Sequence, residues 1–445
     1  MNPATRRTLF VASAVALGTM LYTTGPLYRV RTWWAFEDPL ASDTFVISVQ
    51  IVVGAIAAAA LVRHSRWRRV DPRPAIVAMA LVGWLALSAI WSASPSTTLR
   101  ESLLIGVALV AGAGAAVAAG ERLLVIAAWI GIHLGLGWSA VLIALVRPNS
   151  QDANGEWTGV YFNPNSLALV AAFGILLAVV LLAMISTRRV PGLARTPVRV
   201  VVAAVVSASI VADLWLISGT GALTPLFGLV VALVVAGAAW VAQRFTRGED
   251  RDGVDPRAVA AASGVVLVTL GLVAWFTRGS WLSSVGRTSE LTGRTAMWDV
   301  SLDWFAKSPI VGQGYLGAWY DPQFVAEMLA ARGEVLGTTH NSFIELLLGA
   351  GIVGFGLAIG LFALLWLAAG TRALTGRGVV ATWPLAVLVY VLVENVGETL
   401  LVGGQLMVAT TGALIVVSAA RQPVPPASPP PRVDAVEAVG SERRS

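Results

Sequence analysis

Cysteine is absent from this sequence of 445 residues, and histidine occurs only three times. The absence of cysteine excludes disulfide bonds and thiolate-bound metal ions. Charged residues are also scarce, at 13% of the chain, whereas hydrophobic residues make up 56%. With a mean hydropathy of +0.75, the chain is too apolar for a soluble fold. This composition indicates a membrane protein.

Apolar runs of about 20 residues recur along the whole sequence, and a hydrocarbon core about 30 Å thick requires a helix of about that length. Helices also satisfy their own backbone hydrogen bonds in lipid. We therefore predict an all-α, polytopic helical membrane protein with about 12 transmembrane helices. The predicted spans are 8–24, 45–62, 75–91, 102–119, 123–146, 166–186, 198–217, 222–242, 258–276, 342–369, 379–395 and 405–420.

The loops that are rich in arginine all fall on one side of the predicted membrane. They read "RHSRWRRVDPRP", "STRRVPGLARTPVR", "QRFTRGEDRDGVDPR" and "TRALTGRG". Cytoplasmic loops carry an excess of Lys and Arg. The alternation therefore predicts a multi-pass membrane protein with both termini in the cytoplasm. The net charge of +6 then indicates orientation rather than nucleic-acid binding.

Two long loops fall on the outer side, over residues 147–165 and 277–341. The second lies between the ninth and tenth spans and is far longer than an ordinary connection. It contains several tryptophans, which can bury area, so we expect short helices at the membrane surface. The predicted organisation is one integral membrane domain over 1–420, followed by a disordered, Pro-rich cytoplasmic tail over 421–445.

His340 ends the long outer loop and is followed directly by Asn341 and the span 342–369. One interpretation of His340 is a hydrogen-bonded helix cap. The other is a proton acceptor, because a neutral imidazole is suited to that role near neutral pH. The free N–H groups of the helix N-terminus would favour an anion nearby. Ser342 and Glu345 have capping-box spacing, which supplies a structural reason for Glu345.

The span 342–369 carries several glycines on its first turns, among them Gly351 and Gly354. Small residues let a neighbouring helix approach closely, and a lipid chain would use the same space. Helix packing and substrate binding both explain these glycines.

The outer-loop segment "GRTAMWDVSLDWFAKSPIVGQG" predicts a helix that begins near Arg294 and stops at Pro309. Arg287 and Arg278 lie upstream in the same loop. Arginine forks match phosphate oxygens in a bidentate manner, although a surface arginine near lipid headgroups would look the same. Together with His340, the loop offers an anion-holding arginine and a base.

Two segments of the sequence follow a recognisable pattern. The first consists of Arg294, Trp298, Pro309, Gly312, Gly314, His340, Asn341, Gly351 and Gly354. This order and spacing resemble the O-antigen ligase and O-antigen polymerase superfamily. The second segment, "GVYFNPNSLAL", is similar to a family segment in which an Asn precedes a membrane helix, and Asn165 takes that place. The chain departs from the family at Gly221, where the family often has an arginine.

The resemblance implies a glycosyltransferase without a cofactor, and the lack of a carboxylate-rich site in the outer loops predicts that it is metal-independent. It would move a glycan from an undecaprenyl-diphosphate carrier to an acceptor hydroxyl on the outer face of the bacterial plasma membrane, in surface polysaccharide biosynthesis. His340 would take the acceptor proton or orient the acceptor, and Arg294 would neutralise charge on the diphosphate. Substrate would be bound by Arg287, Arg278, Asn341, Asn165, Gly351 and Gly354.

The implied partners are the lipid-linked glycan donor, a glycan or lipid-glycan acceptor, and membrane lipid, with no nucleic acid. A ligase and a polymerase differ only in the acceptor, which the sequence does not identify.

A polytopic transporter is the alternative from a different functional class. Asp213 and His133 lie inside predicted spans, where ionisable groups are functional candidates, and such a pair would suit a proton-coupled carrier. Glu394 and Glu398 lie near an outer helix end. For each of these four residues, a hydrogen bond between helices and a role at the substrate both stay open.

Overall fold

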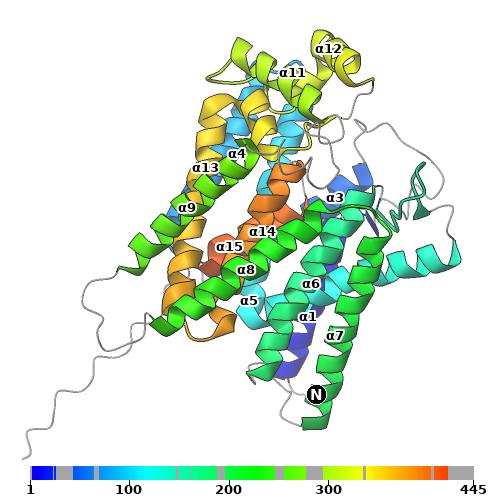
Figure 1. The fold of residues 1–445 in the computed structure, drawn as a ribbon, viewed down its shortest axis with the longest axis vertical. Coiled ribbons are helices and arrows are strands. Elements are labelled where there is room, and N and C mark those ends of the chain that lie inside the picture. Colours follow the sequence, from blue (N-terminus) through cyan, green and yellow to red (C-terminus); the bar gives the residue numbers. More distant parts are fainter. Residues whose placement is uncertain are drawn as a thin grey trace, which may run out of the picture.

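The computed structural model describes residues 3–23, 25–26, 44–64, 70–146, 150–161, 163–187, 196–245, 255–276, 294–333, 337–401 and 405–418. Its regular elements are helices, joined by loops that include one isolated antiparallel bridge between Gln151 and Trp157. Figure 1 shows the long helices side by side, with α11 and α12 across one end of the bundle and the N-terminus at the other. The structure thus confirms the all-α class.

The helices follow the order of the predicted spans. They are α1 (Pro3–Tyr22), α3 (Thr44–Arg63), α4 (Pro72–Leu87), η2 (Ser88–Ile90), α5 (Pro95–Leu145), α6 (Pro164–Ser186), α7 (Thr196–Ser218), α8 (Thr224–Phe245), α9 (Pro256–Phe276), α11 (Arg294–Lys307), η5 (Gly317–Tyr320), α12 (Pro322–Arg332), α13 (Ser342–Thr375), η6 (Val379–Ala381), α14 (Trp383–Gly397) and α15 (Leu406–Ser418).

Seven helical segments in the described part of the chain are long and apolar enough to cross a membrane. This result shows a multi-pass membrane protein. The helices α14 and α15 are apolar but shorter, with 15 and 13 residues. Because a full crossing takes roughly 20 residues, the count of twelve spans stays a prediction.

The helix α5 covers two of the predicted spans, 102–119 and 123–146, within 51 residues. Gly120 separates them, with a φ of 69° and a ψ of 164° that interrupt the helical path. Glycine populates this left-handed region at little steric cost. The two spans are therefore joined by a kink rather than by a loop.

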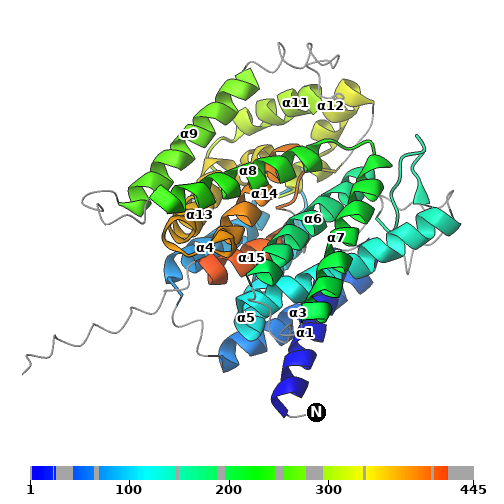
Figure 2. The same cartoon turned by 60° about the horizontal axis from the view of Figure 1, so that its bottom comes forward.

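Small residues let α5 pack closely against other helices. A Cβ added to Gly112 would lie 1.7 Å from the carbonyl oxygen of Ala409 on α15, and one on Gly114 would lie 2.4 Å from that of Ala57 on α3. Such contacts bring helix backbones together, as is common for helices in membranes. Figure 2 shows α6 running through the bundle, and 83% of the residues in its most apolar stretch are buried.

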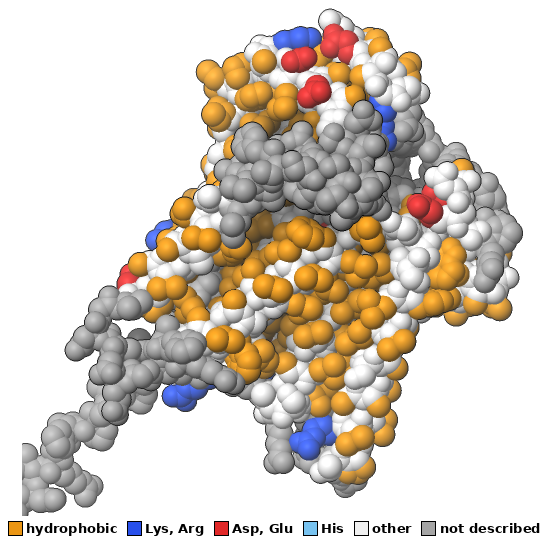
Figure 3. Space-filling view, in the orientation of Figure 1, with side chains coloured by type: hydrophobic (Ala, Val, Ile, Leu, Met, Phe, Trp, Pro, Cys, Tyr) orange, Lys and Arg blue, Asp and Glu red, His pale blue; other side chains and the backbone are white. Residues whose placement is uncertain are grey.

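The surface agrees with a membrane environment. Figure 3 shows hydrophobic side chains over the middle of one face, and the charged side chains visible there lie around its margins. Exposed apolar side chains include Val211 and Phe227, which are 68% and 64% accessible. In a soluble protein an apolar surface of this extent would be a site of association.

The stretch between α9 and α13 contains short helices, as expected from its aromatic residues. Trp319 on η5 is buried and contacts Phe324 of α12 edge-on, with ring centroids 5.1 Å apart. The indole nitrogen of Trp304 on α11 donates to Glu327 Oε2 at 2.6 Å. Arg278 and Arg287 lie outside the described residues, as does the tail 421–445. The outer location of this stretch and the proposed domain limits stay predictions.

Candidate functional site

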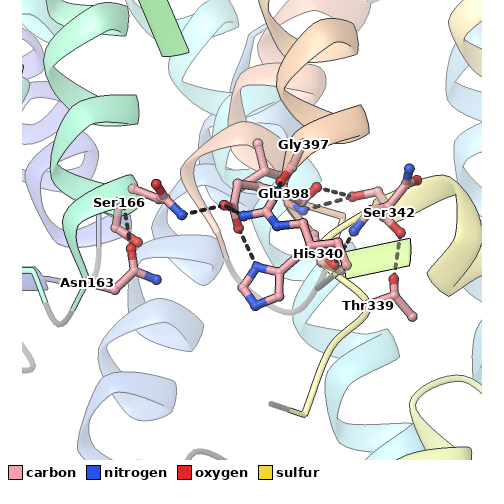
Figure 4. A network of polar contacts seen from close by, with 12 residues as sticks. Asn163, Ser166, Thr339, His340, Ser342, Gly397 and Glu398 are labelled. Atoms are coloured by element: carbon pink, nitrogen blue, oxygen red, sulfur yellow. Dashed lines mark hydrogen bonds and ion pairs between the residues drawn. The ribbon is translucent and has the colours of Figure 1, made fainter. Parts of the chain in front are cut away.

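Three predicted site residues from distant parts of the chain meet at Glu398, the residue that follows α14 (Figure 4). The side-chain nitrogen of Asn165 donates to Glu398 Oε1 at 2.8 Å, and Arg294 Nη2 donates to the same oxygen at 3.0 Å. His340 Nδ1 lies 2.8 Å from Glu398 Oε2. The structure therefore places His340, Arg294 and Asn165 around one carboxylate.

Arg294 opens α11 and reaches the end of α14 with both prongs of its guanidinium. Nη1 donates to the carbonyl oxygen of Gly397, and Nη2 donates to Glu398. A cation at a helix C-terminus is stabilised by the unpaired carbonyl groups and by the helix dipole. The Arg294 side chain keeps 18% of its surface accessible.

His340 adopts a left-handed backbone conformation, with a φ of 49°. For a residue other than glycine this conformation costs about 1–3 kcal/mol and persists only where neighbours enforce it. The neighbours here are hydrogen-bonded on both sides. Thr339 donates its hydroxyl to the Asn341 carbonyl at 2.8 Å, and the Asn341 N–H donates to the Thr399 hydroxyl at 3.1 Å. These bonds hold the left-handed backbone, and in this conformation the imidazole of His340 points toward Glu398.

The contact with Glu398 determines how the imidazole of His340 is protonated. An ionised carboxylate can only accept a hydrogen bond, so Nδ1 carries the hydrogen and donates it. In the neutral ring, Nε2 then holds a lone pair. Among the residues that the structure describes, none binds Nε2, and the side chain is 20% accessible. His340 therefore has one nitrogen fixed and one free to accept a proton.

The charge state of Glu398 follows from its surroundings. Burial acts to raise the pKa of the Glu398 carboxyl, but the hydrogen bond from His340, the charge this ring carries when protonated, and the charge and hydrogen bond of Arg294 outweigh burial. The resulting pKa is below the usual range for a glutamate. Glu398 is thus an anion at neutral pH.

At the N-terminus of α13, the structure differs from two expectations, the free N–H groups and the capping box. The N-cap residue is Asn341, whose side-chain oxygen accepts from the backbone N–H groups of Phe343 and Ile344 at 2.9 and 3.2 Å. These N–H groups are therefore not free to hold an anion. The predicted capping box is also wrong, because Ser342 lies one position inside the helix and its hydroxyl instead accepts from the N–H of Leu400 at 2.8 Å.

Glu345 fastens the loop before the helix. Its carboxylate is 1% accessible and accepts from the indole N–H of Trp319 at 2.9 Å and from the backbone N–H of Thr339 at 2.8 Å. The Thr339 carbonyl in turn accepts from the indole N–H of Trp298 at 2.8 Å. These bonds connect the residue before His340 to α11 and η5, so Glu345 supports the site through the loop.

Gly351 interrupts α13, with a φ of 63° and a ψ of −168°. A Cβ at this position would lie 2.2 Å from the carbonyl oxygen of Ile310 and 2.7 Å from the nitrogen of Gly312. The interruption is stabilised by a hydrogen bond from the Ile352 N–H to the Pro309 carbonyl at 2.9 Å. Protein backbone thus occupies the space beside Gly351.

Gly354 is buried in the same helix, and a Cβ there would lie 3.2 Å from Cδ1 of Trp84 on α4. Close packing accounts for the contacts of both glycines: Gly351 packs against the turn after α11, and Gly354 packs against α4. Their part in substrate binding, and that of Asn341, stay predictions.

The start of α6 differs from expectation by two residues. The asparagine that caps the helix is Asn163, whose side-chain oxygen accepts from the Ser166 N–H at 2.8 Å. Asn165 lies in the first turn and is free to reach Glu398. The motif thus contains two asparagines with different contacts: Asn163 caps the helix, and Asn165 binds Glu398.

The departure at Gly221 has a structural reason. Gly221 has a φ of 64°, and a Cβ there would lie 2.5 Å from Glu156 Oε1. The neighbouring Gly219 carbonyl accepts from the Trp157 N–H at 2.8 Å. This turn is pressed against the loop before α6 and requires glycine.

Sequence reasoning gave Glu398 no defined role, because an acidic residue at the end of an apolar span fits several roles. Glu394, one turn earlier, is buried, and neither of its side-chain oxygens has a hydrogen-bond partner within the described residues. Among all the residues that the structure describes, no three His, Asp or Glu side chains are grouped so as to hold a metal ion. Metal independence stays a prediction.

The fold and this cluster define a class: a multi-pass helical membrane protein with a polar site at one end of its bundle. Residues 208–359 match the family described as O-antigen ligase. This region runs from α7 into α13 and contains Arg294 and His340. The match confirms the resemblance predicted from these motifs and identifies an O-antigen ligase family region in a membrane protein.

A curated relative points in the same direction. The chain is 36% identical over 77 residues to the exopolysaccharide production protein ExoQ of Rhizobium meliloti. The matched residues make up 16% of this chain and 18% of that protein, so the similarity covers less than a fifth of the relative.

Proposed function

We propose that this protein is a glycan transferase that moves a glycan from an undecaprenyl-diphosphate carrier to an acceptor hydroxyl. The observation that carries the proposal is the state of His340: Nδ1 is held by Glu398, which also binds Arg294, and Nε2 has no partner among the described residues. The match to the O-antigen ligase family supports the substrate class. Ligase activity is the first candidate, and polymerase activity is the alternative.

The reaction needs a base for the acceptor. His340 Nε2 takes the proton of the acceptor hydroxyl, whose oxygen bonds to the anomeric carbon of the glycan. The bond between that carbon and the diphosphate breaks, and the lipid diphosphate leaves with the bonding electrons. The proton passes from the imidazolium to solvent or to the diphosphate. Glu398 stabilises the imidazolium while it exists and is a positioning residue, since it acts through His340.

Negative charge grows on the diphosphate as it leaves. Arg294 lies at the same cluster and retains an accessible edge, so it neutralises part of that charge. Arg278 and Arg287 remain further candidates for the diphosphate, and Asn165 for donor or acceptor hydroxyls. No metal or cofactor is required in this scheme.

The donor must reach the site from the outer leaflet. We place α11 and α12 on the extracytoplasmic side and both termini in the cytoplasm, because the Arg-rich loops lie on the side opposite the loop 277–341. A reporter fusion near residue 320 tests this orientation. Extracytoplasmic activity supports it, and cytoplasmic activity overturns both the topology and the site.

A transporter is the weaker alternative. His133 Nε2 lies 3.0 Å from Asp213 Oδ2, so the predicted pair exists. However, His133 Nδ1 also lies 2.8 Å from the Trp129 carbonyl, which leaves neither ring nitrogen free for a substrate. The pair therefore fits a contact between helices better than a carrier site.

The test is a reconstituted transfer assay with the purified full chain, a purified lipid-linked glycan and candidate acceptors. Formation of a glycan–acceptor bond with release of undecaprenyl diphosphate supports the proposal. Donor binding without any transfer across a panel of acceptors, combined with glycan movement across vesicles, would replace it with transport. In a deletion strain, accumulated single repeats indicate a polymerase and accumulated long lipid-linked chains indicate a ligase.

A further inference from the structure

A cavity of about 820 Å³ runs along α1 between Arg7 and Tyr22. Its walls come mainly from α1, α3, α5 and α15. The part contributed by α5 consists mainly of small residues, among them Ala111, Ala115 and Ala118. Because α1 and α3 both pack along α5, these small side chains leave an elongated hollow between the two helices.

The hollow opens toward the expected membrane. Phe10 and Ile56 both line it, and they are 75% and 63% accessible. The path from Arg7 to Tyr22 covers 15 helical steps, or about 22 Å at the helical rise. One leaflet contributes about half of a hydrocarbon core roughly 30 Å thick. The hollow is therefore long enough for one acyl chain.

One end of the hollow is cationic. Arg7 Nη2 lies 3.3 Å from His64 Nε2, and His64 Nδ1 lies 3.0 Å from the Ala60 carbonyl. A guanidinium has no acceptor atom, so His64 Nε2 accepts from Arg7 and Nδ1 donates to Ala60. His64 is then neutral, and the positive charge comes from Arg7 and Arg63.

No acidic side chain lines this hollow as described. Among the described residues, neither Arg7 nor Arg63 forms an ion pair with a carboxylate. Two arginines without a carboxylate partner among the described residues, at the mouth of an apolar groove, complement a ligand with one anionic head and one apolar chain. Arginine also reaches a headgroup readily while its stem stays in apolar surroundings.

We propose that this groove binds one anionic phospholipid, with its phosphate at Arg7 and Arg63 and an acyl chain along α5. The lipid comes from the leaflet on the side of the Arg-rich loops. The polyprenyl donor is a poor fit, because the transfer cluster lies at the other end of the bundle. Trp383 at the start of α14 lines the groove, whereas Glu398 follows the end of that helix, about 22 Å further on.

The experiment measures lipid binding to the purified full chain by native mass spectrometry. Phosphatidylglycerol and phosphatidylcholine with identical acyl chains are titrated separately. An arginine near an anionic headgroup contributes roughly fivefold in affinity, so phosphatidylglycerol should bind about 25-fold more tightly. Arg7→Gln with Arg63→Gln should bring this preference close to one.

A matched control removes the same charge elsewhere. Arg199 and Arg257 begin α7 and α9 and do not line the groove, so Arg199→Gln with Arg257→Gln should keep the 25-fold preference. Equal binding of the two lipids to the wild type, or an unchanged preference after loss of Arg7 and Arg63, would overturn the proposal.

A second variant tests the groove itself. Ala14 lines it and is exposed, so Ala14→Phe should fill the space and weaken phosphatidylglycerol binding about tenfold or more. Leu17 is exposed on the same helix but does not line the groove, so Leu17→Phe is its control and should bind as the wild type does. Equal binding by both variants would contradict the site. Displacement of phosphatidylglycerol by an equal concentration of undecaprenyl phosphate would assign the groove to the donor and overturn the chosen occupant.

Discussion

The molecule contains two histidine–carboxylate pairs of nearly equal length. His340 and Glu398 lie 2.8 Å apart at one end of the bundle, and His133 and Asp213 lie 3.0 Å apart between α5 and α7. In the first pair the carboxylate also binds Arg294, and one nitrogen of the histidine has no partner among the described residues. In the second pair both histidine nitrogens face oxygens.

The two pairs differ in whether a histidine nitrogen stays available to a substrate. A neutral imidazole has one N–H and one lone pair, so two facing oxygens require an extra proton on the histidine or on the acid. Both nitrogens of His133 are therefore occupied by oxygens, and neither is left for a substrate. His340 uses only Nδ1 to bind its carboxylate partner, Glu398. The lengths of the two pairs therefore do not distinguish them. The proposed role of His340 rests instead on its open Nε2 and on a carboxylate that also binds an arginine.

The largest expected effect comes from removal of the open nitrogen. His340→Ala should lower the transfer rate about 10²–10⁴-fold, which is the usual contribution of a general base, while lipid-linked donor still binds. The measurement pairs donor binding with glycan transfer on monodisperse protein. A wild-type transfer rate would return His340 to the role of a strained loop residue.

Arg294 should rank second. Arg294→Ala removes the charge that meets the diphosphate, and a donor to developing charge contributes about 10²–10³-fold. Arg294→Lys should recover little, because a single ammonium does not replace the fork that reaches both Gly397 and Glu398. Transfer rates of the two variants at equal membrane levels check this. If the lysine variant is fully active, charge alone is sufficient and the fork is unnecessary.

Glu398→Gln should have a smaller effect of about 10–100-fold on transfer, because a hydrogen bond to a charged group is worth about 1.5–3 kcal/mol. The glutamine oxygen still accepts from Nδ1, but it does not stabilise an imidazolium. The acidic limb of the pH–rate profile should therefore move to lower pH. An unshifted profile would show that Glu398 only fastens the loop.

The stability of the wild type relative to Glu398→Gln should also depend on pH. The pKa of Glu398 is lowered in the folded protein, so its stabilising contribution is complete above the unfolded-state value of about 4.3. The contribution is lost as pH falls through the lowered pKa. Thermal unfolding at several pH values below about 5 should show a Tm difference that shrinks as the pH falls below about 4. A difference that grows below about pH 4 contradicts the lowered pKa.

The smallest effect on chemistry should come from the internal pair. His133→Leu leaves Asp213, which is 1% accessible, without its partner, and loss of one member of a buried pair costs about 3 kcal/mol. The variant should unfold at a lower temperature and yet transfer glycan at the wild-type rate per folded molecule. A rate loss as large as that of His340→Ala would give both pairs a functional part and revive the transport interpretation.

The order and type of the elements could be predicted because they depend on local signals. Apolar runs predicted the long helices, and Pro309 predicted the end of α11, which stops at Lys307. The motif also predicted that Arg294 and His340 belong to one site, and the structure places both on Glu398. The cap of α13 was missed because Asn341 and Ser342 are both good capping residues, and only the geometry distinguishes them.

The sequence by itself determined the membrane class, the helices and the residue types available for chemistry, since length, hydropathy and proline act over a few residues. Only the tertiary structure decided that Glu398 is the meeting point, because Asn165 lies 233 positions and Arg294 lies 104 positions away from it along the chain. It also decided that His340 keeps a free nitrogen while His133 does not. Hydrogen bonds between residues so far apart depend on how the helices pack. No local sequence pattern predicts that packing, so these partners are known only from the tertiary structure.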